Sequence, residues 1–337
     1  MTAPEKTATE PTVIASRRGR VGHILLNRPR ALNAIDLPMV AAVHAALDDW
    51  RDDPHVHAVV IEGAGGRAFC AGGDIRWVRD RSLAGDHASV EAFFVAEYAL
   101  NLAIAHYPKP YIALIDGVCM GGGIGLSVHG TMRVVTDAAM LAMPETGIGL
   151  FPDIGASFFL PRLRAEYGMY LALTGARVHG ADAVHLGLAT HYVSRDRLAT
   201  LADGIAEHGI AALADTAEVP PPGTMLQLAD TVRCFGGASV DRILADLEAA
   251  GAHETLAVLR AMSPSSVLWS FELLRRGADR TLEQCQAAEL ALTRHTTRHP
   301  DFIEGVRAMV VDKDRTPRWT PARIEDVDPA AIGALFA

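Results

Sequence analysis

The first half of the chain alternates between two kinds of hydrophobic pattern. Short apolar runs rich in β-branched residues, typical of buried strands, occupy residues 21–26, 56–61 and 111–115. Between them, residues 37–50 and 90–106 carry apolar side chains at helical spacing. This alternation of strands and helices predicts an α/β domain with largely parallel strand pairing.

The second half follows a different pattern, because strand-like runs become rare after residue 160 and helical spacing dominates. Pro220, Pro221 and Pro222 form the clearest linker. The pattern predicts three parts: a disordered tail at 1–10, an α/β core at 11–218, and a helical C-terminal region at 219–337 that ends in an extended tail. Beyond the linker, helices are expected at 224–232, 240–249, 253–262, 264–276, 282–295 and 302–309.

Composition excludes some functions and leaves others open. The 337 residues are 50% hydrophobic and 21% charged, which is typical of a globular protein with a large core. Lys and Arg number 31 against 40 Asp and Glu, so the net charge is −9. This balance argues against general nucleic-acid binding, which needs a basic surface, but it allows a local basic pocket for an anionic ligand.

The four cysteines show neither metal-ligand nor C-x-x-C spacing. They are Cys70, Cys119, Cys234 and Cys285. Reduced, buried thiols are the favoured interpretation, and a nucleophilic cysteine is the lesser alternative. We also expect no bound metal.

The N-terminal ten residues, MTAPEKTATE, have no basic n-region followed by an apolar stretch, and they contain no arginine. We identify no apolar run that reaches the ~18–20 residues of a membrane span. These features lead us to expect a cytoplasmic protein without a membrane partner.

Residues 107–163 concentrate the candidate chemistry. Gly121, Gly122 and Gly123 follow an apolar strand and open a helix, and two acids, Glu145 and Asp153, come soon after. A glycine-opened helix presents backbone N–H groups to a developing negative charge, and nearby acids can transfer protons or attack a carbonyl. A second glycine turn at 72–73 also follows a strand, so the two turns can converge at one edge of a sheet. The pattern predicts the active site of an acyl-transfer-type enzyme.

Several longer stretches make the chain resemble the crotonase (enoyl-CoA hydratase/isomerase) superfamily. The general match rests on VGHILLNRPRALNAI at 21–35 and GGRAFCAGGDI at 65–75. A narrower match, to the thioester hydrolases of that superfamily, rests on MGGGIGLSVHG at 120–130, MPETGIGLFPDIG at 143–155 and DFIEGVRAMVVDKDRTPRWTP at 301–321. The resemblance implies a spiral of ββα units with a helical C-terminal region, an acyl-CoA substrate and no cofactor beyond the CoA of that substrate. Because crotonase relatives often form trimers or hexamers, it also suggests a homo-oligomer.

The resemblance also implies roles for individual residues. The backbone N–H groups of Gly73 and Gly122 would bind the thioester oxygen. Glu145 would be catalytic, either by attacking the thioester to form an anhydride or by activating water. Glu97 would contact substrate. The alternatives are a solvated surface position for Glu145, an exposed helical position for Glu97, and simple turns for the glycines.

Two positions favour hydrolysis over hydration. Classical hydratases use two glutamates, and one of them would fall at position 125, where this chain has Gly125. Asp153 stands where hydratases usually carry glycine; it could orient water, hold the substrate hydroxyl, protonate the leaving thiolate, or simply cap the helix expected near 154.

We therefore expect hydrolysis of a short β-hydroxyacyl-CoA, with 3-hydroxyisobutyryl-CoA of valine breakdown as the first choice. The alternatives are an enoyl-CoA hydratase or isomerase and, more remotely, a non-catalytic acyl-CoA-binding protein. Ser127 and His129 suggest a nucleophile and its base, but residues two apart on a helix face different directions, so packing is the favoured interpretation.

Overall fold

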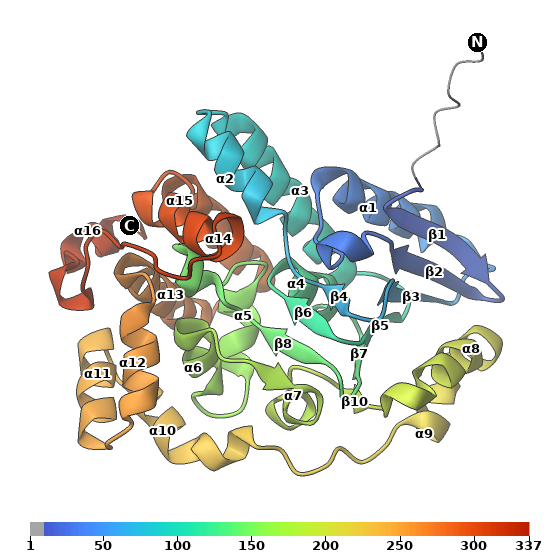
Figure 1. Cartoon of the computed structure of the whole chain (residues 1–337). Helices are drawn as coiled ribbons and strands as arrows, with labels where there is room; N and C mark the ends of the chain where they lie inside the picture. Colours follow the sequence, from blue (N-terminus) through green and yellow to red (C-terminus); the bar gives the residue numbers. More distant parts are fainter. Residues whose placement is uncertain (1–9, 337) are drawn as a thin grey trace.

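The computed structural model describes residues 10–336, and its strands form two sheets (Figure 1). The prediction of a tail at 1–10 falls almost entirely outside the described residues. The larger sheet has the order β1-β2-β3-β5-β7-β10. Its strands are β1 Val13–Arg18, β2 Val21–Leu26, β3 Ala58–Gly63, β5 Tyr111–Ile115, β7 Met132–Val135 and β10 His191–Tyr192.

Pairing in the larger sheet is parallel except at one edge. β1 and β2 form an antiparallel hairpin, and every following pair is parallel. Side chains alternate between its two faces: Val59 and Ile61 of β3 belong to the main core, whereas Ala58 and Val60 belong to a second cluster. Burial on both faces explains why the inner strands β2, β3 and β5 are mostly apolar runs, whereas the edge strand β1 is largely exposed. The predicted α/β class with largely parallel pairing is confirmed.

The smaller sheet has the order β4-β6-β8-β9 and consists of two- and three-residue strands. Its members are β4 Ala68–Cys70, β6 Val118–Met120, β8 Met140–Ala142 and β9 Val178–His179. β4 and β6 pair in parallel, so the glycine turns that follow them leave the same edge. The predicted convergence of residues 72–73 and 121–123 is therefore explained by two strands too short to be recognised in the sequence.

The sixteen α-helices that fall within residues 10–336 surround these sheets. They are α1 Leu37–Arg51, α2 Ile75–Leu83, α3 His87–Ala105, α4 Gly122–Val128, α5 Ala156–Phe159, α6 Tyr167–Thr174, α7 Gly180–Leu186, α8 Leu198–His208, α9 Ala211–Thr216, α10 Ala229–Arg233, α11 Val240–Ala249, α12 His253–Ala261, α13 Pro264–Gly277, α14 Leu282–Thr296, α15 Pro300–Val306 and α16 Pro329–Ala334. Most predicted helices are present. Helices α2, α9 and α16 were not predicted, and α16 lies in the region expected to be extended.

Helix α3 corrects one statement of the sequence analysis. With 19 residues it is long and apolar enough to cross a membrane by length and composition, although no such run was recognised. The same composition suits a core helix: α3 packs against α1, α14, α2 and α4, and Phe93, Leu100 and Ile104 are buried in the main hydrophobic core. The expectation of no membrane partner stays a prediction.

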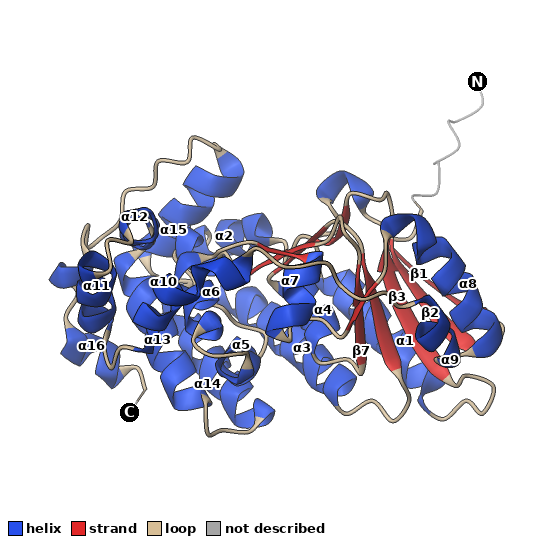
Figure 2. Cartoon of the chain, turned by 90° about the horizontal axis from the view of Figure 1, so that it is seen from below, coloured by secondary structure: helices blue, strands red, loops and turns tan. Residues whose placement is uncertain are grey.

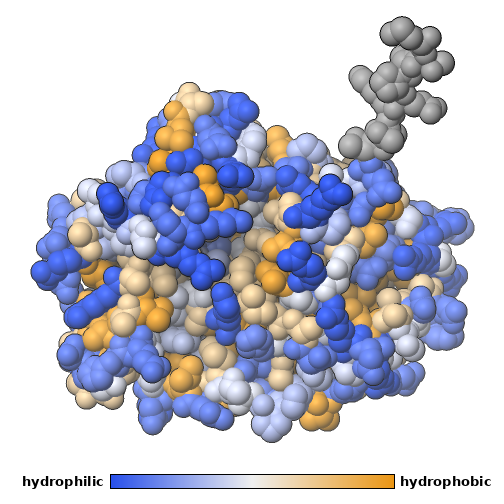
Figure 3. All heavy atoms as spheres, in the orientation of Figure 1, coloured by the Kyte–Doolittle hydropathy of each residue, from blue (hydrophilic) through white to orange (hydrophobic). Residues whose placement is uncertain are grey.

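The C-terminal helices pack on the core. Figure 2 shows the larger sheet with α1, α8 and α9 at one end of the molecule and α11, α12, α13 and α16 gathered at the other. Between these ends, α14 contacts α3, α13 contacts α5, and α15 contacts α2. Hydrophilic residues cover most of the face seen in Figure 3, with hydrophobic residues in scattered patches, as is usual for a surface that faces water. The helical region therefore lies where it can help build a site in the core.

Candidate active site

Two neighbouring backbone N–H groups lie at the exit of the smaller sheet. Ile35 N donates to Gly72 O at 2.9 Å and Asp74 N donates to Ile35 O at 2.8 Å, so this bridge bypasses Gly73 N. Gly122 N is the first N–H of α4 and has no preceding turn to bond. Among residues 10–336, neither N–H donates a hydrogen bond to a protein acceptor. A β-carbon at Gly122 would lie 3.2 Å from Gly73 N, which shows how close the two donors are.

Glycine leaves room at this corner for carboxyl groups that approach the backbone closely. A β-carbon on Gly122 would collide with Oε1 of Glu97. One on Gly121 would lie 2.8 Å from Oε1 of Glu145, and Gly121 also has a φ of +46°, which disfavours other residues. The glycines therefore do more than form turns: they bring two free donors and two acids together.

Glu145 is buried at the start of the 3₁₀ helix Glu145–Ile148, with only 5% of its surface exposed. Within the described part of the chain its Oε2 atom is buried without a hydrogen-bond partner. Burial, together with the nearby charges of Asp153 and Glu97, raises its pKa well above the usual range. The alternative of a solvated surface position is wrong, and a buried acid with an unused oxygen is suited to proton transfer or attack on a substrate.

Asp153 is equally buried, and a tyrosine holds it in place. The hydroxyl of Tyr98 on α3 donates to Asp153 Oδ2 at 2.9 Å. Burial raises the pKa of Asp153 to about 6, while the Tyr98 hydrogen bond acts in the opposite direction. Asp153 does not cap α5, whose N-cap is Gly155 without a side-chain bond. Sequence reasoning missed Tyr98, although a buried tyrosine in an apolar helix needs a partner for its hydroxyl.

Glu97 completes a cluster of three carboxyl groups. It is 3% exposed, so the alternative of an exposed helical glutamate is wrong. Among residues 10–336 its Oε1 atom has no hydrogen-bond partner, and burial followed by repulsion from Asp153 raises its pKa well above normal. The shared rise in pKa means that Glu97, Glu145 and Asp153 do not all ionise together near neutral pH.

At position 125, where classical hydratases carry their second glutamate, neighbouring side chains occupy the space beside Gly125. A β-carbon on Gly125 would lie 2.9 Å from Asn101 Nδ2 and 3.0 Å from Ile154 Cβ. Such distances are shorter than ordinary carbon contacts, so even alanine would push its neighbours. A glutamate at position 125 would need both Asn101 and Ile154 to move.

The remaining candidates do not form a second site. Ser127 Oγ donates to Gly123 O and Ile124 O inside α4, and His129 Nε2 donates to Ile154 O at 2.7 Å. Burial lowers the pKa of His129 to about 4, so this histidine is neutral. These two residues are structural, and the nucleophile–base alternative is wrong.

The thiols are poorly suited to nucleophilic attack. All four cysteines are free and buried, as predicted, and burial raises the pKa of the Cys70 thiol to about 12, which makes it a poor nucleophile. Over residues 10–336 no group of three or more His, Cys, Asp or Glu side chains is placed to hold a metal ion.

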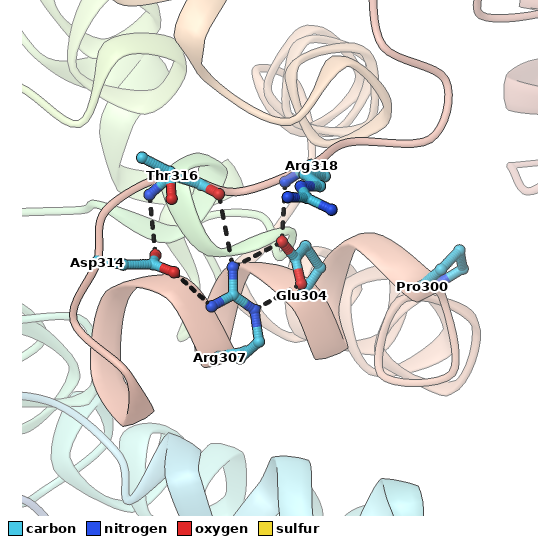
Figure 4. Close-up of a pocket in the computed structure, with 6 residues that line it drawn as sticks. All are labelled: Pro300, Glu304, Arg307, Asp314, Thr316 and Arg318. Atoms are coloured by element: carbon cyan, nitrogen blue, oxygen red, sulfur yellow. Dashed lines mark hydrogen bonds and ion pairs between the residues drawn. The ribbon is translucent and has the colours of Figure 1, made fainter.

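A polar pocket near the C-terminus, of about 380 Å³, contains none of the predicted site residues (Figure 4). Arg307 crosses it and bonds Glu304 at 2.8 Å, Asp312 at 2.7 Å and Asp314 at 2.6 Å. These ion pairs tie the segment after α15 back onto the helix. We therefore interpret the pocket as a space left where the segment after α15 folds back onto that helix.

Curated relatives match nearly the whole chain. The chain is 42% identical over 340 residues to 3-hydroxyisobutyryl-CoA hydrolase, mitochondrial, of Rattus norvegicus, covering 96% of this chain and 88% of the relative. It is 40% identical over 346 residues to the protein of the same name in Xenopus laevis, covering 98% and 90%. The similarity to these relatives therefore extends over nearly the whole chain and is not confined to the motifs quoted from the sequence.

These relatives contradict the expected cytoplasmic location, because their names place them in mitochondria. That expectation was drawn from ten N-terminal residues and from hydropathy. Neither property distinguishes one aqueous compartment from another, and residues 1–9 lie outside the described structure.

Solved structures and a family model agree on the fold. A carnitinyl-CoA dehydratase from Mycobacterium thermoresistibile superposes with a TM-score of 0.93 at 37% identity, covering 97% of this chain and 96% of its own. An enoyl-CoA hydratase from Rhodobacter sphaeroides superposes with a TM-score of 0.91 at 37% identity, covering 97% of each. The enoyl-CoA hydratase/isomerase family model matches residues 21–336. The chain belongs to the enoyl-CoA hydratase/isomerase family and has the crotonase fold.

Proposed function

We propose that the protein hydrolyses a short β-hydroxyacyl-CoA thioester, and that its substrate is 3-hydroxyisobutyryl-CoA, an intermediate of valine breakdown. The products are 3-hydroxyisobutyrate and CoA. The names of the curated relatives support this substrate. The observation that carries the proposal is the closeness of two backbone N–H donors, which have no protein acceptor among residues 10–336, to the buried carboxyl groups of Glu97 and Glu145, with the position of the second hydratase acid filled.

In this proposal the two donors bind the oxygen of the thioester carbonyl. Negative charge develops on that oxygen when the carbonyl carbon is attacked, and N–H groups already in place stabilise it without reorganisation. Each such donor contributes roughly 2.7–4 kcal/mol to the transition state in enzymes where one has been removed. Gly73 N and Gly122 N have no competing protein acceptor among the described residues, so they are available to the substrate.

Glu145 and Asp153 have different roles in the proposed reaction. Burial raises the pKa of both acids, and the charge of Asp153 raises the pKa of Glu145 further, so the two do not ionise together near neutral pH. When Glu145 acts as a carboxylate, the proton of the pair is on Asp153. Glu145 either attacks the carbonyl carbon as a carboxylate, giving an anhydride that water cleaves, or takes a proton from the attacking water. Asp153 then orients the water or the substrate hydroxyl, or returns a proton to the thiolate of CoA. The reaction needs no cofactor beyond the CoA of the substrate.

Isotope transfer identifies an anhydride that water cleaves at the Glu145 carbonyl carbon, because only that route leaves the label on the enzyme. In a single turnover in H₂¹⁸O, an anhydride cleaved at the Glu145 carbonyl carbon leaves ¹⁸O on the enzyme and none in the first product. Direct attack by water puts ¹⁸O into the product acid at once. Mass spectrometry of the released acid and of the peptide containing Glu145 reads both outcomes.

Water addition to an enoyl-CoA is the second candidate, favoured by the names of the two solved structures at 37% identity. The packing around Gly125 opposes it, because Asn101 and Ile154 occupy the space of a second glutamate. A hydratase would have to use Glu145 and Asp153 in place of the usual pair.

The function is tested by following CoA release with a thiol reagent. We expect saturable release from 3-hydroxyisobutyryl-CoA by the unaltered protein and loss of most of it in Glu145→Gln. Glu254→Gln is the matched control, because Glu254 is an exposed glutamate on α12. Absence of CoA release together with efficient hydration of crotonyl-CoA would contradict the proposal.

A further inference from the structure

The turn that carries Asp153 has an unusual backbone. Ile154 has a φ of +55° and Gly155 a φ of +82°, while Ala156 N donates to Asp153 O at 2.9 Å. Glycine adopts such angles readily, but a β-branched residue rarely does. A conformation of this kind persists only where surrounding contacts impose it, and it is common at functional sites.

A carboxyl group from the C-terminal region imposes part of this conformation. Glu289, on α14, is fully buried and lies more than 130 positions from the turn in sequence. Its Oε2 accepts from Gly155 N at 2.7 Å. Its Oε1 accepts from Ser157 N at 3.0 Å and from Ser157 Oγ at 2.5 Å. On the other side of the turn, His129 Nε2 donates to Ile154 O at 2.7 Å.

We propose that Glu289 is a positioning residue for the reaction: it holds the backbone of residues 154–157 and thereby aims the Asp153 carboxyl group at the substrate. This inference rests on the proposed function of Asp153. The carboxyl group itself is fixed independently, by the hydroxyl of Tyr98. Helices α3 and α14, which supply Tyr98 and Glu289, pack against each other, so both constraints belong to one rigid unit.

The arrangement explains why a distant acid does this work. Helix α5 has a glycine N-cap without a side chain, so the N–H groups of Gly155 and Ser157 need an acceptor from elsewhere, whereas Ala156 N bonds Asp153 O. Asp153 is adjacent and could have accepted them, as aspartates commonly do at helix starts. Because Glu289 accepts these bonds, the Asp153 carboxyl group is not used as a helix cap and bonds the Tyr98 hydroxyl instead.

Burying Glu289 has a cost that a purely structural cap would not require. Burial raises the pKa of Glu289 to about 8 despite the three hydrogen bonds, which act in the opposite direction, and Asp153 adds repulsion. A neutral serine or asparagine can accept bonds from helical N–H groups without this cost. Only the carboxyl group offers two acceptor oxygens, so that one can bond Gly155 N and the other Ser157.

The decisive experiment is a double-mutant cycle between Glu289→Gln and Asp153→Asn, measured on CoA release. Glutamine has the same shape but one acceptor oxygen, so it can serve Ser157 or Gly155 but not both. We expect Glu289→Gln to lower kcat at least about tenfold with KM changed less than about threefold. In the Asp153→Asn background the same change should have little further effect. Ser157→Ala, which removes one of the three bonds, should give a smaller loss.

Hydrogen exchange measures the positioning separately from the chemistry. The peptide containing residues 153–159 should exchange faster in Glu289→Gln, while peptides from α11 should not change. If the unaltered protein releases no CoA but the turn loosens as expected, the proposed function fails and the positioning contact stands. Unchanged kcat, additive losses in the cycle, or unchanged exchange at the turn would each overturn the proposal. Should Glu289→Gln not fold, Ser157→Ala in the same cycle tests the same coupling to Asp153.

Discussion

The two sides of the candidate site are built differently. The donor side consists of backbone N–H groups on two glycine turns, each placed by a short strand directly before it. The acid side consists of side chains whose positions depend on α3 and α14, far away in sequence. The donor side is therefore local and rigid, whereas the acid side depends on packing between the core and the C-terminal region. Substitutions should affect the two sides in different ways.

The largest effect is expected on the donor side. In Gly122→Ala the added β-carbon would collide with Glu97 and stand 3.2 Å from Gly73 N. We expect kcat/KM for CoA release to fall by at least about 100-fold, because the added β-carbon would block the approach of the thioester oxygen to the two donors, an effect comparable to losing one of them. Gly333→Ala on α16 is the control, because open space surrounds that glycine. Because alanine keeps the backbone N–H, activity within a few-fold of the unaltered protein would show that the space beside Gly122 is not needed for the thioester oxygen.

The next largest effect is expected for the acids. Glu145→Ala and Asp153→Asn should each lower kcat at least about tenfold, because a positioned acid or base contributes about that much or more. Both side chains are buried, so circular dichroism should accompany the kinetics. A variant that is folded and fully active would exclude its residue from catalysis.

Tyr98→Phe should produce a shift in pH dependence. The Tyr98 hydroxyl donates to Asp153 and lowers the pKa of that carboxyl group, so its removal raises the pKa above about 6. The limb of kcat/KM against pH that reports Asp153 should therefore move to higher pH in the variant. A limb that stays in place would show that another group controls it.

A smaller effect concerns stability. The Asp153 carboxyl group has a usual pKa of 3.8 and is raised to about 6 in the folded protein. The unfolded chain therefore loses this proton first, and stability falls as pH rises from about 4 to 6. Asp153→Asn removes this loss and should raise the free energy of unfolding at pH 8 by about 1–3 kcal/mol. Urea titrations at pH 4 and pH 8 measure it; an equal effect at both would contradict the linkage.

The contrast between the local donor side and the long-range acid side also explains how much could be predicted from the sequence. Strand Tyr111–Ile115 and helix Val240–Ala249 were predicted with the bounds seen in the structure, because their hydrophobic patterns are long and regular. Strands β4 and β6 have three residues each, too few to show a period, yet they place both glycine turns.

Contacts between residues that are far apart in the chain could not be predicted from the sequence. Glu97, Glu145 and Asp153 could be selected by resemblance, and the structure brings them together, but their catalytic roles stay a prediction. Nothing in the sequence links Glu289 to Gly155, because that bond depends on how α14 packs. The cytoplasmic location was wrong because hydropathy carries no information about the compartment.

The central claim is that this site cleaves a thioester instead of hydrating a double bond. The most direct measurement compares kcat/KM for CoA release from 3-hydroxyisobutyryl-CoA with kcat/KM for hydration of crotonyl-CoA, using one preparation of the protein. We predict that CoA release is faster by at least about 100-fold, and that Glu145→Gln abolishes it. Faster hydration of crotonyl-CoA, with no release of CoA, would contradict the account.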